Sequence, residues 1–332
     1  MNIKQPSRFG LTLSGCIALL GAAVSPAALA QSLVYPARSI TLLVPTAPGG
    51  TTDIAARMIA DPLAKALGQP VVVENRGGGN GSIAAVAVKR AAADGYTLLM
   101  QYSGYHVITP AIVKNPGWDP VKDFAPVANV LSAPQVIVVR EGLPVKTLPE
   151  LVTYAKANPG KLNYASSGNG SLQHVTGEML KQQAGIDMTH IPYKGTGPTI
   201  TDLLGGNVDL TFGTPPPFMG HIQTGKLRAI AVTGKSRVAS LRDVPAASEV
   251  GYPKLDATSW FAVFAPAATP KPIIDKLTSE IDKLMKTETF RRKAEELGAQ
   301  ANYMNPKELG DFTAAELSRW GQVVKSAQIQ AD

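Results

Sequence analysis

The stretch ITLLVPTAPGGTTDIAARMIADPLAKAL, residues 40–67, indicates how this chain folds. Its first five residues form a short run rich in β-branched side chains, which is typical of a buried strand. A loop with the glycine pair Gly49-Gly50 follows. From Thr52 to Leu67 apolar residues recur at helical spacing. Strand, glycine loop and helix in this order are the opening half of a βαβ unit.

The same alternation continues along the chain and predicts an α/β fold with parallel sheets and crossover helices. The strands are short apolar runs, as in sheets that helices cover on both faces. After residues 40–44 we expect strands at 71–73, 97–100, 135–139, 162–165, 208–212 and 227–232, and helices at 52–67, 82–92, 148–157, 171–184, 272–285, 290–297 and 306–324.

The length of the chain predicts two domains, because roughly 300 residues after the leader exceed what one hydrophobic core usually organises. Weak boundaries lie near residues 129–134 and 252–260. If the chain crosses between domains at both, one domain is continuous and the other is made from the two chain ends. We therefore expect residues 31–131 and 255–332 in lobe one and residues 132–254 in lobe two.

The first thirty residues predict export. Lys4 and Arg8 precede an apolar stretch from Leu11 to Val24, and the small residues of Ala28-Leu29-Ala30 follow. This order is typical of a secretory signal peptide, and the stretch is shorter than the ~20 residues of a spanning helix. We expect residues 1–30 to be removed by cleavage after Ala30 and the mature protein to be periplasmic.

Leu13-Ser14-Gly15-Cys16 offers a competing interpretation, because it matches the box at which bacterial lipoproteins are lipidated. Cys16 lies inside the apolar region, however, whereas a lipidated cysteine follows it, so the A-x-A cleavage site explains more of the segment. Cys16 is the only cysteine, so we expect no disulfide, thiol chemistry or cysteine metal site in the mature chain.

The charge of the chain suits an anionic ligand and not a nucleic acid. Lys and Arg number 32 against 25 Asp and Glu; without Lys4 and Arg8 the balance is 30 against 25, a net charge of +5. The basic residues are dispersed and aromatic residues are sparse, which argues against nucleic-acid binding. The four histidines, at positions 106, 174, 190 and 221, have no metal-binding spacing, and we expect neither metal nor cofactor.

Two strand-to-helix loops are candidates for binding an anion. Pro48-Gly49-Gly50 lets a ligand approach the backbone closely, and the helix that follows offers free N–H groups and its dipole. Taken alone, an ordinary capped turn is the better explanation of this loop, because glycine-containing turns are common. A second donor-rich loop, Ser166 to Ser171, precedes another helix, so the pair suggests a carboxylate held between lobes. The glycine-rich stretch 77–82 also precedes a helix, and we place it at the rim of the cleft.

Enzyme chemistry has little support in the sequence. The nucleophile elbow G-x-S-x-G is absent, because Gly168-Asn169-Gly170-Ser171-Leu172 has its serine in the wrong place. Neither a metal cluster nor paired carboxylates beside a histidine occur. A periplasmic hydrolase acting on an ester therefore remains the weaker alternative to a non-catalytic receptor.

Several motifs in order along the chain resemble the Bug family, the extracytoplasmic receptors of tripartite tricarboxylate transporters. The resemblance spans essentially the whole mature chain. It is carried by Tyr35-Pro36, Val44-Pro45, Pro48-Gly49-Gly50 with Asp53 and Ala56-Arg57, and by residues 73–76 (VENR), 93–99 (ADGYTLL), 164–168 (YASSG), 190–195 (HIPYKG) and 206–210 (GNVDL).

This resemblance implies a two-lobed, Venus-flytrap fold of the type II periplasmic binding protein kind, with the ligand in the interlobe cleft. It implies a small carboxylate ligand, one large and one small membrane subunit as partners, and no catalysis; we expect a monomer. Carried over by position, the ligand contacts are Thr46, Pro48, Gly49, Gly50, Asp53 and Ser103 in lobe one, and Ser166, Ser167, Asn169, Gly170, Ser171, Tyr193, Lys194, Gly195 and Thr214 in lobe two.

The ligand itself is a further hypothesis. Tyr105 and His106 follow a strand, and together with His174, Tyr193 and Trp260 they could stack on a flat ligand, although each could equally be structural. We therefore expect an aromatic carboxylate of the phthalate type, with an aliphatic di- or tricarboxylate such as citrate as the alternative. A receptor that signals to a membrane sensor instead of a transporter would have the same sequence features.

Overall fold

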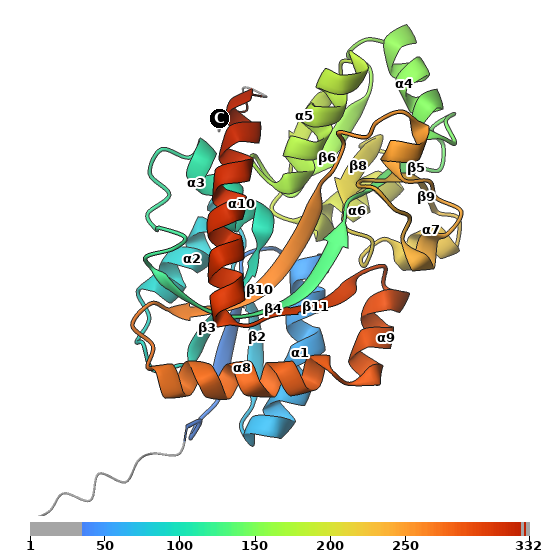
Figure 1. Ribbon diagram of the computed structural model, residues 1–332. Coiled ribbons are helices and arrows are strands. Elements are labelled where there is room, and N and C mark those ends of the chain that lie inside the picture. The colour runs from blue at the N-terminus through green and yellow to red at the C-terminus, as the bar shows by residue number, and fades with distance from the viewer. Residues whose placement is uncertain (1–34, 327–328, 330–332) are drawn as a thin grey trace, which may run out of the picture. The chain divides into compact units, whose positions relative to one another are not determined.

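The computed structural model describes residues 35–326 and residue 329, and residues from Tyr35 onward form one compact unit. The predicted signal peptide, its cleavage site and Cys16 lie outside the described residues. Two β-sheets organise the described chain (Figure 1).

The first sheet has six strands in the order β11-β4-β10-β3-β1-β2. Strand β1 pairs in parallel with β2 and β3, whereas β10 is antiparallel to β3 and β4, and β11 is antiparallel to β4. The strands are β1 (Ile40–Val44), β2 (Val71–Asn75), β3 (Thr97–Tyr102), β4 (Phe124–Pro134), β10 (Thr258–Pro266) and β11 (Gln300–Met304).

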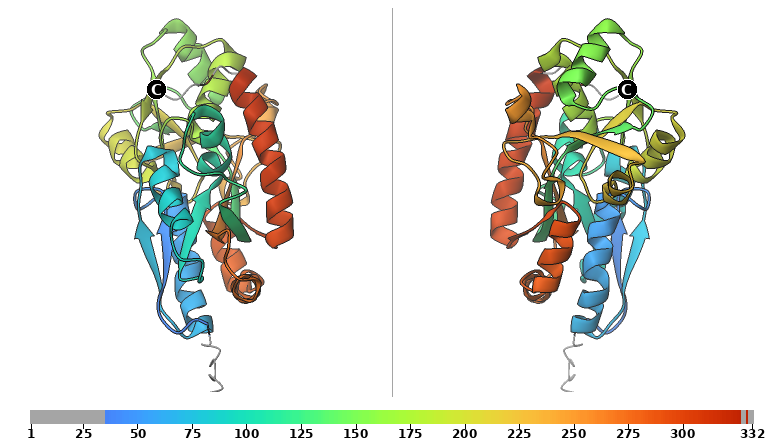
Figure 2. Two further views of the ribbon diagram at one scale, coloured as in Figure 1. Left: turned by 90° about the vertical axis from the view of Figure 1, so that its left-hand side faces the viewer. Right: turned by 90° about the vertical axis from the view of Figure 1, so that its right-hand side faces the viewer.

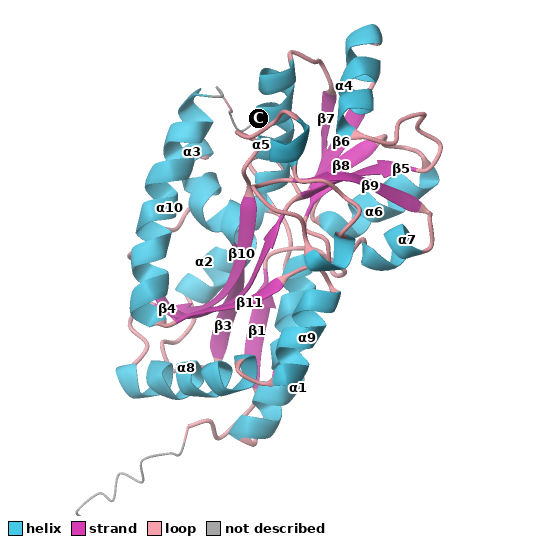
Figure 3. Cartoon of the chain, turned by 45° about the vertical axis from the view of Figure 1, so that its right-hand side comes forward, coloured by secondary structure: helices cyan, strands magenta, loops and turns pink. Residues whose placement is uncertain are grey.

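The second sheet has five strands in the order β7-β6-β8-β5-β9. Strand β6 is parallel to β7 and β8, and β5 is antiparallel to β8 and β9. Figure 3 shows the two groups of strands, which are joined where β4 leads into β5 and where the chain returns along β10. The strands are β5 (Val136–Arg140), β6 (Asn163–Ser166), β7 (Thr189–Pro192), β8 (Leu210–Gly213) and β9 (Leu227–Val232).

Helices cover both faces of the first sheet. The chain crosses from β1 to β2 and then back past β1 to β3, and the right-handed rule for such connections places α1 and α2 on opposite faces of the sheet. Helix α8 contacts α1, whereas α10 contacts β4 and the turn after β3 (Figure 2). The helices are α1 (Thr51–Leu67), α2 (Ser82–Lys89), α3 (Thr109–Ile112), α4 (Leu148–Ala157), α5 (Leu172–Ala184), α6 (Thr196–Gly205), α7 (Met219–Gln223), α8 (Lys271–Met285), α9 (Glu288–Glu296) and α10 (Pro306–Ser326), with shorter turns at Gly79–Gly81, Gly104–Ile108, Ala239–Leu241 and Ala247–Val250.

The α/β class is confirmed, but the expectation of purely parallel sheets is wrong. Strands β4, β7, β10 and β11 were not expected, and residues 129–134, taken as a boundary, are the end of β4. The reason is that the chain passes from β4 into β5 through Gln135 alone, without a crossover helix. The lobe limits set at residues 131 and 255 stay a prediction; we use lobe one and lobe two for the elements of the first and second sheets.

The helix spacing predicted for α8 is confirmed. Its residues Ile274, Leu277 and Ile281 are buried in the core of lobe one. Two further apolar cores belong to lobe two, and Val136 and Ile137 on β5 point into different ones. Burial on both faces of β5 explains why its sequence is a continuous apolar run.

Candidate functional site

A small cavity lies where the loops after β1 and β6 meet. Its volume is about 20 Å³, which is space for about one water molecule. Both lobes contribute to its wall, so it is the interlobe cleft in a closed state. The lining residues are Thr46, Gly50, Thr51, Thr52, Tyr102, Ser259 and Phe261 from lobe one, Ser167, Gln173, Thr196 and Thr214 from lobe two, and Gln135 between them.

The loop after β1 brings the beginning of α1 to the cavity. No side chain caps this helix at Gly50, and Thr51 and Thr52 in its first turn line the cavity wall. Gly49 has a left-handed backbone (φ +85°), which glycine adopts without strain. The free N–H groups and the dipole of α1 therefore favour negative charge at the cavity.

The carboxylate of Asp53 stabilises this loop through hydrogen bonds. Its carboxylate accepts hydrogen bonds from the backbone N–H of Gly49 (3.1 Å) and from Nε of Arg57 (3.1 Å). Burial by itself would raise the pKa of Asp53, but the hydrogen bonds from Arg57, Gly49 and Asn75 together hold that pKa below its ordinary value. Asp53 does not line the cavity, so we assign it a positioning role and not the ligand contact that we expected.

In the loop after β6, Ser167 alone lines the cavity, while its neighbours hold the loop in shape. The hydroxyl of Ser166 lies 2.6 Å from Nε2 of His190, and Ser171 caps α5 by accepting the N–H of His174. The N–H of Gly170 donates to Nδ1 of His174 (3.0 Å).

The rings of His174 and His190 stack with their centroids 3.9 Å apart. Because Ser166 is fully buried outside the cavity and also bonds the backbone of Gly168, its contact with His190 is structural. Asn169 does not line the cavity either.

The loop after β7 brings a second helix N-terminus to the cavity. Helix α6 begins at Thr196, and Gly195 before it has φ +134° and no side-chain cap. Of the expected residues, Tyr193 donates its hydroxyl to Asp202 (2.6 Å) and, with Pro48, lines a separate hollow of about 570 Å³ at the mouth of the cleft. Lys194 contributes its backbone carbonyl, which accepts the N–H of Ala47 (3.1 Å).

Direct contacts hold the cleft closed. The hydroxyls of Thr51 and Thr214 are 2.6 Å apart, and the hydroxyl of Tyr105 donates to the carbonyl of Ser167 (2.5 Å). A Cβ atom placed on Gly197 would lie 2.2 Å from the carbonyl oxygen of Pro48, so only glycine permits this approach. The two loops around the cavity therefore touch backbone to backbone.

Three polar atoms in the cavity wall are buried without a hydrogen-bond partner among the described residues. They are Oγ1 of Thr46, Oε1 of Gln135 and Oγ of Ser167. Buried polar atoms are normally paired, and leaving one unpaired costs about 1–3 kcal/mol. The residues that line the cavity include no charged side chain, so the wall is built to bind a polar solute through neutral donors and helix N-termini.

The aromatic residues expected in the cleft lie elsewhere. His106 is 0% exposed and stacks on Phe264 with the ring centroids 4.3 Å apart; burial lowers the pKa of its imidazole to about 3. Trp260 is 1% exposed, and its backbone N–H donates to Oγ of Ser103 (3.2 Å). We therefore correct the expected lining: Ser103, Tyr105, His106 and Trp260 do not line the cavity, because the chain turns into the interior directly after β3.

The aromatic side chains that line the cavity were not among the residues predicted from the sequence. Tyr102 and Phe261 stack with ring centroids 5.8 Å apart and an angle of 18° between their planes. The sequence also missed Gln135, Gln173 and Ser259 as lining residues. Thr51, Thr52 and Thr196 could have been found, because each lies in the first turn of a helix that follows a glycine loop.

Other kinds of site are not found in the part of the chain that the structure describes. There, no group of three or more His, Cys, Asp or Glu side chains could hold a metal ion. No helix within residues 35–326 is long and apolar enough to cross a membrane.

Comparisons with known proteins agree with this geometry. Residues 55–329 match the family model of the tripartite tricarboxylate transporter family receptor. The chain is 35% identical to Protein BugT of Bordetella pertussis over 95% of this chain and 98% of that one. It also resembles the solved structures of the periplasmic binding protein BugD (36% identity, TM-score 0.86) and of a Rhodopseudomonas palustris protein with adipate (36%, 0.87), each covering 90% of this chain and 100% of the other.

The match to the family model extends over most of the chain. The two mixed sheets, with a closed cleft between them, have the arrangement of a two-lobed solute-binding protein. The family is one of receptors and not of enzymes. This chain belongs to the Bug family of tripartite tricarboxylate transporter receptors, which are periplasmic solute-binding proteins.

Proposed function

We propose that this receptor binds a small organic dicarboxylate in the cleft and delivers it to the two membrane subunits of a tripartite tricarboxylate transporter. The observation that carries the proposal is the set of three unpartnered polar atoms, on Thr46, Gln135 and Ser167, in a cavity wall shared by both lobes. A ligand with several acceptors and a donor or bridging water would pair all three.

A carboxylate would be held without a salt bridge. The first turns of α1 and α6 both reach the cavity and have no side-chain cap, so their N–H groups are available to oxygen atoms. A helix N-terminus stabilises a nearby negative charge by ~0.3–1 kcal/mol and more when partly buried. Hydroxyl donors on Thr46 and Ser167 complete a neutral anion site, which releases its ligand more readily than a buried ion pair would.

Binding requires the cleft to open and then to close around the ligand, in a state less compact than the unliganded closed one. A cavity of about 20 Å³ cannot contain a dicarboxylate, so a ligand enters only when the contacts Thr51–Thr214 and Ala47–Lys194 separate. Binding energy then stabilises a closed state around the ligand. We propose that the transporter distinguishes this liganded form from the unliganded one.

Two ligand classes follow from different features of the cavity. The neutral polar wall suits a flexible aliphatic dicarboxylate, and the similar Rhodopseudomonas palustris structure contains adipate. The stacked rings of Tyr102 and Phe261 favour a flat, aromatic acid of the phthalate type. We place the aliphatic class first, because most lining residues are neutral and polar and the similar Rhodopseudomonas palustris structure contains an aliphatic dicarboxylate.

A thermal-shift panel tests the proposal. The mature chain is heated with adipate, malate, citrate, phthalate and benzoate, each at millimolar concentration, with glucose and lysine as controls. Stabilisation by aliphatic dicarboxylates is the expected result, since a ligand at 100 times its Kd adds about 2.7 kcal/mol of stability. Stabilisation by the aromatic acids alone would reverse the order of the two classes, and no stabilisation by any acid would reject the proposal.

A further inference from the structure

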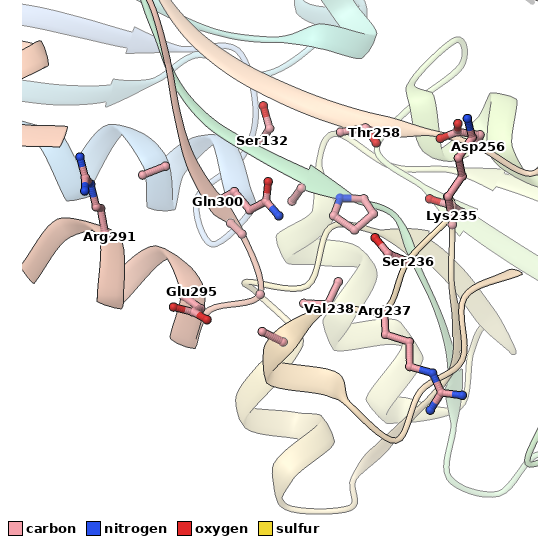
Figure 4. Close-up of a pocket in the computed structure, with 18 residues that line it drawn as sticks. Ser132, Lys235, Ser236, Arg237, Val238, Asp256, Thr258, Arg291, Glu295 and Gln300 are labelled. Atoms are coloured by element: carbon pink, nitrogen blue, oxygen red, sulfur yellow. The ribbon is translucent and has the colours of Figure 1, made fainter. Parts of the chain in front are cut away.

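Two hollows beside the crossings between the lobes differ in how they could discriminate between anions. The larger one has a volume of about 630 Å³, and its walls carry side chains of both charges, shown in Figure 4: Lys235, Arg291, Asp256 and Glu295. Its charges therefore select neither sign. The residues that line the small cleft cavity include no charged side chain. In the cavity, the number of carboxylates that can bind depends on how many helix N-termini have free N–H groups.

Three helices begin at the cleft cavity. Thr51 of α1, Thr196 of α6 and Gln173 in the first turn of α5 all line it. Neither α1 nor α6 has a side-chain cap. A ligand with two carboxylates therefore finds free N–H groups at one helix of each lobe.

The N-terminus of α5 is different, because the N–H groups of its first turn are already bonded within the protein. The N–H of Leu172 donates to the hydroxyl oxygen of Tyr102 (3.0 Å), and the N–H of Gln173 donates to the same oxygen. The N–H of His174 donates to Oγ of Ser171 (3.3 Å). A phenolic oxygen from lobe one thus occupies the place at α5 that an anion would take.

The packing of lobe one holds Tyr102 in this position. Its ring stacks on Phe261 and meets the ring of Tyr105 edge-on, with 5.1 Å between the centroids. Burial and the neighbouring Tyr105 raise the pKa of the Tyr102 phenol above its ordinary value, so the group is neutral at physiological pH. The end of α5 is therefore occupied by a neutral oxygen, and a carboxylate can reach these N–H groups only if the phenol is absent.

Further contacts join the turn after β3 to the beginning of α5. The hydroxyl of Tyr105 donates to the carbonyl of Ser167 (2.5 Å). A Cβ atom added to Gly104 would lie 2.7 Å from the backbone nitrogen of Leu172, so the two segments approach backbone to backbone. Tyr102 therefore meets α5 within a close interlobe contact.

Ser167 shows that a ligand is bound next to this blocked helix end. It lines the cavity and is 3% exposed, and its Oγ has no hydrogen-bond partner among the described residues. The side chain of Gln173 donates to Oγ1 of Thr196 (3.0 Å), so the first turns of α5 and α6 are joined directly. A carboxylate that binds at α6 and at Ser167 lies beside the N-terminus of α5.

We propose that Tyr102 is a specificity-determining residue. By occupying the N-terminus of α5 whenever the cleft is closed, it limits the receptor to ligands with two carboxylates and excludes tricarboxylates. The inference rests on the proposed function, because it concerns the same cleft. A third carboxylate would enter this corner without N–H groups to pair with it, and a buried charge without partners is strongly unfavourable.

Calorimetry with two acids that differ by one carboxylate tests this role. Tricarballylate is glutarate with a carboxylate added to its central carbon. The mature wild-type chain is expected to bind glutarate at least about tenfold more tightly than tricarballylate. Tyr102→Val removes the phenol and keeps a β-branched residue on β3. This variant is expected to shift the ratio of the two Kd values at least about tenfold towards tricarballylate.

Phe261→Val is the matched control. Phe261 also lines the cavity and stacks on Tyr102, but it has no polar atom that could bond α5. The control variant enlarges the cavity without freeing the helix end, so both affinities can fall while their ratio changes by less than about threefold. Equal shifts of the ratio in the two variants would show that space alone admits the third carboxylate and would overturn the role of Tyr102.

Two further outcomes would contradict the inference. One is an unchanged ratio in folded Tyr102→Val, and the other is equal affinity of the wild type for the two acids. Tyr102→Leu, which fills more of the space left by the ring, is measured alongside in case Tyr102→Val does not fold, and a shift of at least about threefold is expected. If the wild type binds neither these acids nor any acid of the thermal-shift panel, the proposed function fails and the inference with it. Glutarate binding with an unchanged ratio rejects the role of Tyr102 alone.

Discussion

The hydroxyls of Thr51 and Thr214 lie 2.6 Å apart and join the two lobes across the cleft. Thr51 begins α1, and Thr214 directly follows β8, so the two residues lie at strand-to-helix connections of different sheets. Both also line the cavity. Because the closed cavity is only about 20 Å³, this contact must separate before a ligand can enter.

Replacing Thr214 by valine is expected to strengthen ligand binding, because the Thr51–Thr214 contact belongs to the unliganded closed form and must separate before a ligand enters. Valine keeps the shape of threonine but leaves the hydroxyl of Thr51 unpaired in that form, at a cost of ~1–2 kcal/mol. We expect a gain of up to about tenfold in affinity for whichever acid the thermal-shift panel identifies, measured by calorimetry. Thr201→Val, at an exposed position on α6, is the matched control, and an equal gain there would argue against this role of the contact.

Replacing Gly197 by alanine is expected to block full closure while the fold survives. Its Cβ would meet the carbonyl oxygen of Pro48 at 2.2 Å, a clash that exists only between lobes. Within α6 itself alanine is the better helix former, by about 1 kcal/mol. We expect an unchanged or higher Tm and affinity reduced at least about tenfold; Gly220→Ala on α7, where an added Cβ meets no atom within 4 Å, is expected to bind normally.

Acid is expected to destabilise lobe two through the histidine pair. Burial, the neighbouring His174 and Lys181 together lower the pKa of His190 to about 3. Between pH 6.5 and 3 the unfolded chain therefore binds a proton that the folded chain rejects, so stability falls as the pH falls through this window, by up to about 1.4 kcal/mol per pH unit.

Urea titrations between pH 7 and 4 measure this effect. His190→Gln is expected to flatten the pH dependence of the unfolding free energy, and His221→Gln is the control. An unaltered slope in His190→Gln would show that other groups cause the acid sensitivity.

Asp53 supports the loop after β1 and is expected to matter for stability as well as for binding. Asp53→Asn removes a buried carboxylate that accepts hydrogen bonds from Gly49 and Arg57, and we expect about 1–3 kcal/mol less stability at neutral pH. Because hydrogen bonds lower the pKa of Asp53 in the folded protein, the wild type keeps this contribution above the ordinary carboxyl pKa and loses it as pH falls through the folded value. The two proteins should therefore converge in stability in strong acid; a difference that stays constant with pH would contradict this role.

The sequence predicts those parts of this protein that depend on local pattern. The limits of α4 and β9 agree with the structure residue for residue, and the glycine loop after β1 leads to the N-terminus of α1 at the cavity as expected. The helix α6, whose N-terminus also reaches the cavity, was not predicted. Local patterns could not show that β4 continues through residues 129–134, because a strand that crosses between lobes has no helix after it. They also could not distinguish Tyr102, which lines the cavity, from Tyr105 and His106, which are buried in the helical turn that follows β3.

Calorimetry on the cavity wall tests the central claim most directly. The mature chain, the variant T46V/S167A and the control S82A are titrated with the acid that gives the largest thermal shift. Loss of two hydroxyl donors to a bound carboxylate is expected to raise Kd at least about thirtyfold without lowering the Tm of the unliganded protein, while S82A binds as the wild type does. Wild-type affinity in folded T46V/S167A would contradict the assignment of this cavity as the carboxylate site.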